Sequence, residues 1–190
     1  MLVSFVAPKQ FGKSTACSIL KKHWGDDVAQ INFKDGLIAE IKQNFPDLLR
    51  EISSKHYAFK KDEVLTGGDA IDSLFVSKPP LIRTLMQNYG TEVRRKENPR
   101  HWTDKYQDMV GKSQATHIMT DDCRFINEAE TIKNYGGILI RLNRTDKVNT
   151  DTHQSETEQF EIKCDYEITC AEGEFDKLER ELLAIVATLV

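Results

Sequence analysis

Residues 2–14 read Leu-Val-Ser-Phe-Val-Ala-Pro-Lys-Gln-Phe-Gly-Lys-Ser and join a short apolar run to a glycine–lysine–serine turn. The apolar run predicts a buried strand at residues 2–7, and apolar side chains at helical spacing predict a helix over residues 13–24. A loop between such elements directs backbone N–H groups inward and adds the positive end of the helix dipole. The stretch therefore predicts a phosphate-binding loop at the start of an α/β fold.

Residues 7–14 fit a relaxed form of G-x-x-x-x-G-K-[ST], in which Ala7 stands for the first glycine. Alanine is disfavoured at positive φ, so we expect an ordinary strand-end conformation at Ala7. Lys13 would neutralise charge on the β- and γ-phosphates, and the Ser14 hydroxyl would bind Mg²⁺. The residues expected to bind ATP are Gln10, Phe11, Gly12, Lys13, Ser14 and Thr15.

A second glycine–lysine–serine tripeptide at residues 111–113 provides an internal comparison. Tyr106 stands where its first glycine would be, and a strand pattern rather than a helix pattern follows it. The first copy therefore has the strand–loop–helix context that binds phosphate, and the second copy lacks it.

Composition and charge limit the classes of protein that fit. The 190 residues, 39% of them hydrophobic, suffice for one substantial core and are few for two ordinary domains. A formal net charge of −4 gives no general attraction to nucleic acid polymers or acidic membranes, so any anion site must be local. The four cysteines form no C-x-x-C pair and no apolar run reaches membrane-spanning length, so we expect reduced thiols and a cytoplasmic location.

Short apolar runs alternate with segments of helical period, which indicates a parallel sheet with covering helices. Strands are expected at residues 2–7, 28–33, 116–121, 137–142 and 166–170. Further helices are expected at residues 35–46, 80–89, 127–135 and 174–189. Asp35 is a candidate N-cap, Pro46 would close its helix, and residues 46–79 have the mixed polarity of an insertion over the sheet.

Three clusters rich in arginine and carboxylates lie at loop positions, where binding residues concentrate. The motifs are Leu85-Met86-Gln87, Gly90-Thr91-Glu92-Val93-Arg94-Arg95, Trp102, Asp122-Cys123-Arg124-Phe125-Ile126-Asn127-Glu128-Ala129, Gly136-Gly137-Ile138-Leu139-Ile140-Arg141 and His153-Gln154-Ser155-Glu156. Together with the phosphate loop, their order resembles the deoxynucleoside monophosphate kinases of bacteriophages over most of the chain. Ala7 departs from that pattern, and so does Arg94, where a small residue is usual.

The resemblance implies an α/β three-layer P-loop kinase fold: a five-stranded parallel sheet flanked by helices, a helical acceptor-binding lobe and a lid loop. It implies a single domain over residues 1–190, with its core at 1–45 and 111–190, the lobe at about 46–110 and the lid at about 143–160. The implied reaction moves the γ-phosphoryl group of MgATP to a deoxynucleoside 5′-monophosphate, in the host cytoplasm if the protein is phage-encoded. Base preference and oligomeric state, a homodimer included, stay open.

Transfer between two anionic substrates needs cations between them. The resemblance assigns that role to Lys13, Arg124, Arg95 and Arg144, with Arg144 on the mobile lid. Asp122, at a strand end, would orient Mg²⁺ together with Ser14. The residues implied to bind the acceptor are Asp35, Arg83, Gln87, Glu92, Trp102, Asp122 and Arg124, with Trp102 stacked on the base.

Several of these residues have a structural interpretation that the sequence leaves open. Packing, helix capping or a helix surface would account for Trp102, Asp35, Glu92 and Glu128. A solvated face is typical of runs such as Arg94, Lys96 and Arg100. His153 would equally order the loop, because this chemistry needs no strong general base.

Three other classes of protein share part of the pattern. A small GTPase is disfavoured, because residues 143–146 resemble N-K-x-D but the D-x-x-G at 108–111 follows a helical segment. A related small-molecule kinase, such as one for dephospho-coenzyme A, stays open. So does a catalytically silent nucleotide-binding module that regulates a partner, although the acceptor-side arginines would have no purpose there.

Overall fold

The computed structural model describes residues 1–57, 68–147 and 154–189 of the chain. It forms two compact units, a sheet unit (Met1–Phe33 and Thr103–Val190) and a helical unit (Lys34–Trp102). The helical unit corresponds to the expected lobe, but it begins and ends earlier than residues 46–110.

The sheet unit is built on five parallel strands, as the sequence predicts. The strands are β1 (Leu2–Val6), β2 (Val28–Gln30), β3 (His117–Thr120), β4 (Ile138–Arg144) and β5 (Tyr166–Cys170). Their order is β2-β3-β1-β4-β5, so β1 lies in the centre with β3 and β4 as its neighbours. The carboxyl ends of these three strands therefore meet at one edge of the sheet.

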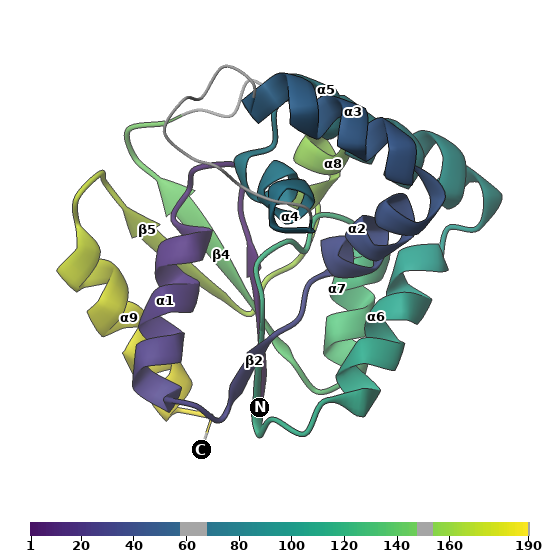
Figure 1. The fold of residues 1–190 in the computed structure, drawn as a ribbon. Coiled ribbons are helices and arrows are strands. Elements are labelled where there is room, and N and C mark those ends of the chain that lie inside the picture. Colours follow the sequence, from purple (N-terminus) through teal and green to yellow (C-terminus); the bar gives the residue numbers. More distant parts are fainter. Residues whose placement is uncertain (58–67, 148–153, 190) are drawn as a thin grey trace. The chain divides into compact units, whose positions relative to one another are not determined.

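Helices cover both faces of this sheet (Figure 1). One face carries α1 (Lys13–Trp24) and α9 (Phe175–Ala187), and the other carries α6 (His101–Lys112) and α7 (Ile126–Asn134). Two short helices, α8 (Gln154–Thr157) and the 3₁₀ helix η2 (Glu158–Phe160), precede β5. No helix among the described residues is both long enough and apolar enough to cross a membrane.

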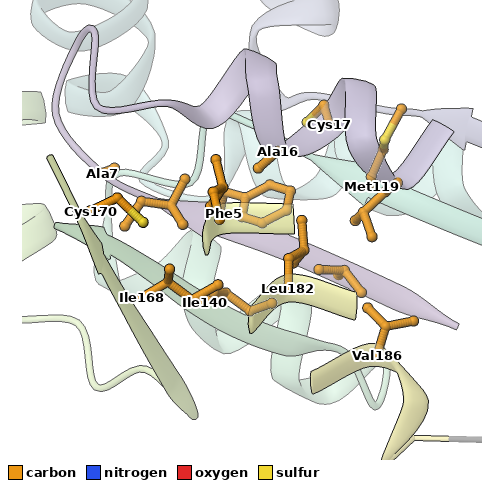
Figure 2. Packing of buried hydrophobic residues seen from close by; sticks show 14 residues of the cluster. Phe5, Ala7, Ala16, Cys17, Met119, Ile140, Ile168, Cys170, Leu182 and Val186 are labelled. Atoms are coloured by element: carbon orange, nitrogen blue, oxygen red, sulfur yellow. The ribbon is translucent and has the colours of Figure 1, made fainter. Parts of the chain in front are cut away.

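The core between the sheet and the α1–α9 layer explains the continuous apolar runs of the strands. Figure 2 shows Phe5, Ile140 and Ile168 from the strands packed with Leu182 and Val186 from α9. All five side chains are almost fully buried. The central strand β1 is buried along its whole length, so it shows no polar face in the sequence, whereas the edge strand β5 alternates exposed and buried residues.

The junction after β2 differs from the prediction of a strand over residues 28–33. β2 ends at Gln30, and α2 (Phe33–Asn44) begins two residues before Asp35. The first helical N–H, that of Phe33, donates to Asp122 Oδ1 at 3.0 Å. Asp35 therefore lies in the first turn of α2, and the carboxylate that caps this helix comes from the loop after β3.

The helical unit contains α2, α3 (Pro46–Tyr57), α4 (Gly68–Ser77) and α5 (Pro80–Gln87), followed by a π-helix, η1 (Asn88–Arg95). Pro80 begins its helix as predicted, whereas Pro46 begins α3 instead of closing α2. Proline suits a first turn, where the missing N–H has no helical partner. An eight-residue π-helix is rare, and π-helical turns occur often at functional sites.

Candidate functional site

The phosphate loop follows β1 directly and ends where α1 begins. Gly12 is the N-cap of α1 with φ 92°, and its carbonyl accepts from Ala16 N at 2.9 Å. The other positive φ in the loop, 65°, belongs to Gln10, so Ala7 keeps the ordinary conformation that the sequence predicts. The left-handed glycine turns the chain from the loop directly into α1, and the N–H groups of a first helical turn are the ones that bind anions.

The side chains of the loop hold it in shape. The Lys13 ammonium group donates to the carbonyl oxygens of Ala7 and Pro8, the latter at 2.7 Å. Lys147, just after β4, donates to Gln10 Oε1 at 3.3 Å. The cation of Lys13 thus lies over the loop itself, where it can meet phosphate oxygens bound by the loop amides.

A pocket of about 230 Å³ lies beside the start of α1. Ser14 and Cys17 line it from α1, Gln30 from β2, and Asp121 from the end of β3. The neighbouring Asp122, which the sequence analysis selected, instead has a carboxylate oxygen engaged by the α2 cap. Sequence reasoning missed Asp121, although successive side chains at a strand end point to opposite sides and the pair could have been separated on that ground.

Arg124 lies in the loop between β3 and α7, with 27% of its side chain exposed. Its guanidinium group pairs with the carboxylate of Glu156 on α8, and its backbone N–H donates to Glu128 Oε2 at 2.8 Å. Glu128 also accepts from Phe125 N at 3.2 Å, so it caps the start of α7, as the structural interpretation of Glu128 predicts. Both the backbone and the side chain of Arg124 are therefore fixed by carboxylates.

Arg144 is the last residue of β4, so the strand extends into the region predicted as a lid. Its guanidinium donates to both carboxylate oxygens of Asp146, at 2.8 and 2.6 Å, and pairs with Glu172 at 3.3 Å. Only 12% of the side chain is exposed. The expected mobile arginine is thus a strand-end residue held by two carboxylates, and His153 of the same motif lies outside the described residues.

The helical unit carries the acceptor-side residues of the sequence analysis. Arg83 and Gln87 are half-buried on α5, and their four-residue spacing places them on one helix face. Arg95 is half-buried at the end of η1. Glu92 is exposed and pairs with Lys96 at 2.6 Å, which agrees with its helix-surface alternative.

Trp102 packs in the core of the helical unit, as its structural alternative predicts. Its side chain is buried, and its indole N–H donates to Gly90 O at 2.9 Å. Gly90 leaves little space there, because a Cβ at this position would lie 3.2 Å from Leu37 Cδ2. The expected stacking of Trp102 on a base is therefore not supported, since packing already covers the ring.

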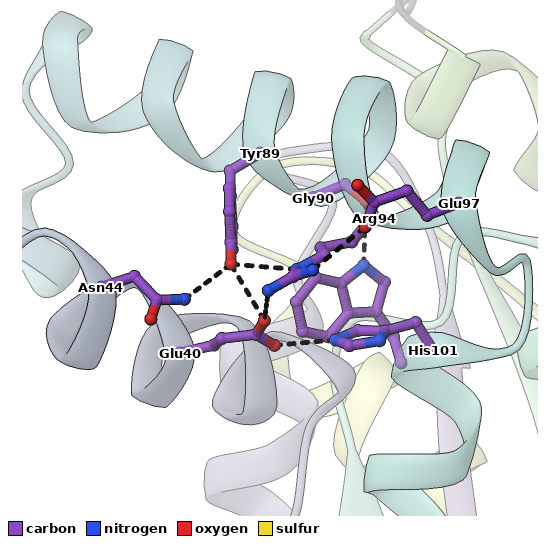
Figure 3. Close-up of polar contacts among 8 residues, drawn as sticks. Glu40, Asn44, Tyr89, Gly90, Arg94, Glu97 and His101 are labelled. Atoms are coloured by element: carbon purple, nitrogen blue, oxygen red, sulfur yellow. Dashed lines mark hydrogen bonds and ion pairs between the residues drawn. The ribbon is translucent and has the colours of Figure 1, made fainter.

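Arg94 is not part of a solvated face, contrary to the sequence interpretation. Figure 3 shows it in a polar cluster with Glu40, Tyr89 and His101. Glu40 pairs with Arg94 at 2.5 Å and with His101 Nε2 at 2.7 Å, and it accepts from the Tyr89 hydroxyl at 2.9 Å. Burial opposes the ionisation of Glu40, but the hydrogen bonds from His101 and Tyr89 and the nearby charges outweigh it and lower its pKa to about 2.

The two groups of predicted site residues therefore occupy different units. In the sheet unit, the structure brings Lys13, Ser14, Asp122, Arg124 and Arg144 to the carboxyl ends of β1, β3 and β4. In the helical unit, Arg83, Gln87, Glu92 and Arg95 follow one another along α5 and η1, and Asp35 lies on α2.

A parallel sheet in this strand order, with a glycine–lysine–serine loop between its central strand and the first helix, defines a P-loop kinase fold. The sequence model described as "Deoxynucleotide monophosphate kinase" matches residues 69–182, more than half of the chain. The chain therefore belongs to the deoxynucleotide monophosphate kinase family, and it is a nucleotide kinase.

The chain is also similar to individual proteins over most of its length. A protein of Acanthamoeba polyphaga mimivirus described as "Putative deoxynucleotide monophosphate kinase" is 28% identical over 164 residues, or 86% of this chain and 84% of the relative. Among solved structures, the chain is similar to a dephospho-CoA kinase from Campylobacter jejuni (15% identity, TM-score 0.45, 99% and 96% coverage). It is also similar to a shikimate kinase from Aquifex aeolicus (13% identity, TM-score 0.47, 98% and 96% coverage).

Proposed function

We propose that this nucleotide kinase transfers the γ-phosphoryl group of MgATP to a deoxynucleoside 5′-monophosphate and releases ADP and the deoxynucleoside diphosphate. The observation that carries the proposal is the position of Lys13 and Arg124 after adjacent strands of one sheet, in a chain of this family. The O–P bond to the γ-phosphorus of ATP breaks as an acceptor phosphate oxygen attacks in line. No covalent enzyme intermediate is needed.

The donor side of the reaction uses the phosphate loop. Backbone N–H groups at the start of α1 bind the phosphate oxygens, and Lys13 offsets charge on the β- and γ-phosphates. The guanidinium of Arg124 stabilises the charge that spreads over the transferring oxygens. These roles are electrostatic, so the residues must be fixed in place before the substrates bind.

Ser14 and Asp121 carry oxygen ligands of the kind that Mg²⁺ bound with ATP prefers. Both residues line the pocket along α1, which Cys17, Ser18, Lys21, Gln30 and Met119 also line. The described residues hold no cluster of three or more histidine, cysteine or carboxylate side chains suited to a metal. One or two protein ligands are usual for Mg²⁺ that travels with a nucleotide, and the ion would neutralise phosphate charge.

The acceptor side draws on residues of the helical unit. Arg83 would bind the acceptor phosphate as a planar fork, with Gln87 on the same face of α5. Asp35, Glu92 and Arg95 would complete the acceptor site. Trp102 is left out of this set, because it is buried against its own unit.

A coupled assay of ADP release tests this function. The purified protein is given MgATP and, one at a time, the common deoxynucleoside and ribonucleoside 5′-monophosphates, with dephospho-coenzyme A as the acceptor of another kinase class. At least one deoxynucleoside monophosphate should raise ADP release far above the rate without acceptor, and Lys13→Ala should lower that rate by about 10²-fold or more. Equal rates with and without every monophosphate would exclude the proposal, and a response to dephospho-coenzyme A alone would assign the other class.

A further inference from the structure

Glu156 is an almost buried carboxylate that the proposed reaction does not use directly. Its side chain is 8% exposed, and it lies on α8 in the sheet unit. A buried carboxylate without a cation would be costly, and its ion-pair partner here is the guanidinium of Arg124. The pair therefore connects the segment before β5 to the loop after β3.

The Glu156 carboxylate also accepts a hydrogen bond from its neighbour Gln159. Gln159 Nε2 donates to Glu156 Oε2 at 3.2 Å and to Glu156 O at 3.0 Å. The backbone carbonyl oxygen of Gln159 accepts two hydrogen bonds from the buried Arg141 of β4, both at 3.2 Å. Because β4 pairs with the central strand β1, these contacts tie the segment that carries Glu156 to the centre of the sheet.

A second contact fixes the same two segments. Glu158 Oε1, in η2, accepts from Ile126 N at 2.9 Å, two residues after Arg124. The loop that carries Arg124 is thus held at its backbone by Glu158 and Glu128, and at its guanidinium by Glu156. The pair to Glu156 uses the Nη1 end of the fork, and 27% of the arginine side chain stays exposed.

We infer that Glu156 is a positioning residue: it holds the Arg124 guanidinium ready for the transferring phosphoryl group and does not itself touch substrate. This inference rests on the proposed function and deepens it. Ordering an arginine side chain costs about 2 kcal/mol in rotamer entropy. The ion pair with Glu156 offsets that cost in the free enzyme, so the guanidinium is already ordered when substrate binds. Without the pair, each turnover must order Arg124 anew.

Kinetics of Glu156→Gln test the inference, because the substitution keeps the shape of the side chain and removes its charge. We expect kcat to fall by about 10- to 30-fold, the factor that matches the rotamer entropy of one arginine, while KM for ATP changes little. Arg124→Ala should lose more, and adding Glu156→Gln to Arg124→Ala should cause no further loss in kcat. Glu161→Gln, an exposed carboxylate of the same segment, is the matched control and should keep wild-type kcat.

Two results would overturn the inference: wild-type kcat in Glu156→Gln, or the same loss of kcat whether or not Arg124 is present. If Glu156→Gln does not fold, Glu156→Asp replaces it in the test, because aspartate keeps the negative charge. Its shorter side chain should hold the Arg124 guanidinium less well, and kcat should still fall. The Nε–H resonance of Arg124 in ¹⁵N NMR, assigned with Arg124→Lys, gives a readout that needs no turnover. The Nε proton of Arg124 should exchange slowly with solvent in the wild type and faster in either Glu156 variant. Equal exchange rates would count against the positioning role of Glu156. That conclusion would hold even if the wild type phosphorylated no monophosphate.

Discussion

Two arginines with similar exposure, Arg124 in the sheet unit and Arg94 in the helical unit, are each paired with a nearly buried glutamate. Arg124 is 27% exposed and pairs with Glu156, and Arg94 is 29% exposed and pairs with Glu40. Arg94 also donates to the Tyr89 hydroxyl at 2.9 Å and to Glu97 at 3.0 Å. Its guanidinium is thus surrounded by partners from its own unit.

The two arginines differ in their surroundings and in the role that we propose for each. The cluster around Arg94 joins α2, η1 and the start of α6, so its hydrogen bonds stabilise the helical unit (Figure 3). Arg124 follows β3, at the sheet edge that also carries the phosphate loop. The named partners of Arg94 all belong to its own cluster, whereas Arg124 lies at that sheet edge, so we expect Arg124 rather than Arg94 to bind phosphate oxygens.

The comparison predicts its largest effect for Arg124→Ala. The kcat for phosphoryl transfer should fall by about 10²- to 10³-fold, because a preorganised donor to the transferring oxygens is lost. Arg94→Ala should keep kcat near the wild-type value in the folded protein and should lower the free energy of unfolding instead. Steady-state kinetics and denaturant unfolding of both variants check this, and a kinetic loss of similar size in Arg94→Ala would remove the distinction.

Glu40→Ala should be the most destabilising single change in the helical cluster. It leaves Arg94 and His101 without their shared carboxylate, and breaking such a pair costs about 3 kcal/mol. Guanidinium unfolding measures the change. Glu97→Ala is the matched control, because that carboxylate is exposed and its loss should cost less than about 0.5 kcal/mol.

The lowered pKa of Glu40 implies that the free energy of unfolding depends on pH. The pKa of Glu40 is about 2 in the folded protein and 4.5 ordinarily, so its ionised form contributes stability above pH 4.5 that is lost as the pH falls toward 2. The groups that face it are His101, Arg94 and Tyr89. Over that range the unfolding midpoint of the wild type should fall more steeply than that of Glu40→Gln, and parallel curves would exclude Glu40 as the titrating group.

The fold was largely predictable because its strands are short apolar runs with turn residues on either side. All five predicted strands and the helix after the phosphate loop are present. The signal is clearest for β1, β3 and β4, which are buried over most of their length, whereas the edge strand β2 is shorter than predicted and β5 alternates between exposed and buried residues. Residues 46–79 were predicted as an insertion without defined helices, but the structure has α3 and α4 there. Leu49 and Ile52 of α3 are buried at a spacing of three residues, so part of that helical signal was present in the sequence.

The candidate site was predictable where a motif fixes backbone geometry, as at Gly12 and Lys13. Side-chain partners were not, because they depend on residues distant in sequence. Asp122 caps α2 from 89 positions away, and Arg94 meets Glu40 across two helices. The sequence shows that Arg94 is charged but not that it pairs with Glu40, so a run of charges was interpreted as a solvated face.

The smallest predicted effect concerns Trp102, which the sequence left open between a base-stacking residue and a core residue. Trp102→Phe removes the indole donor to Gly90 O, and one lost hydrogen bond should cost about 1 kcal/mol of unfolding free energy. If the ring acts through packing alone, KM for the monophosphate stays at the wild-type value while the unfolding midpoint falls. A rise in KM without a change in midpoint would instead mean that the indole reaches the acceptor base, and the acceptor set proposed above would then have to include it.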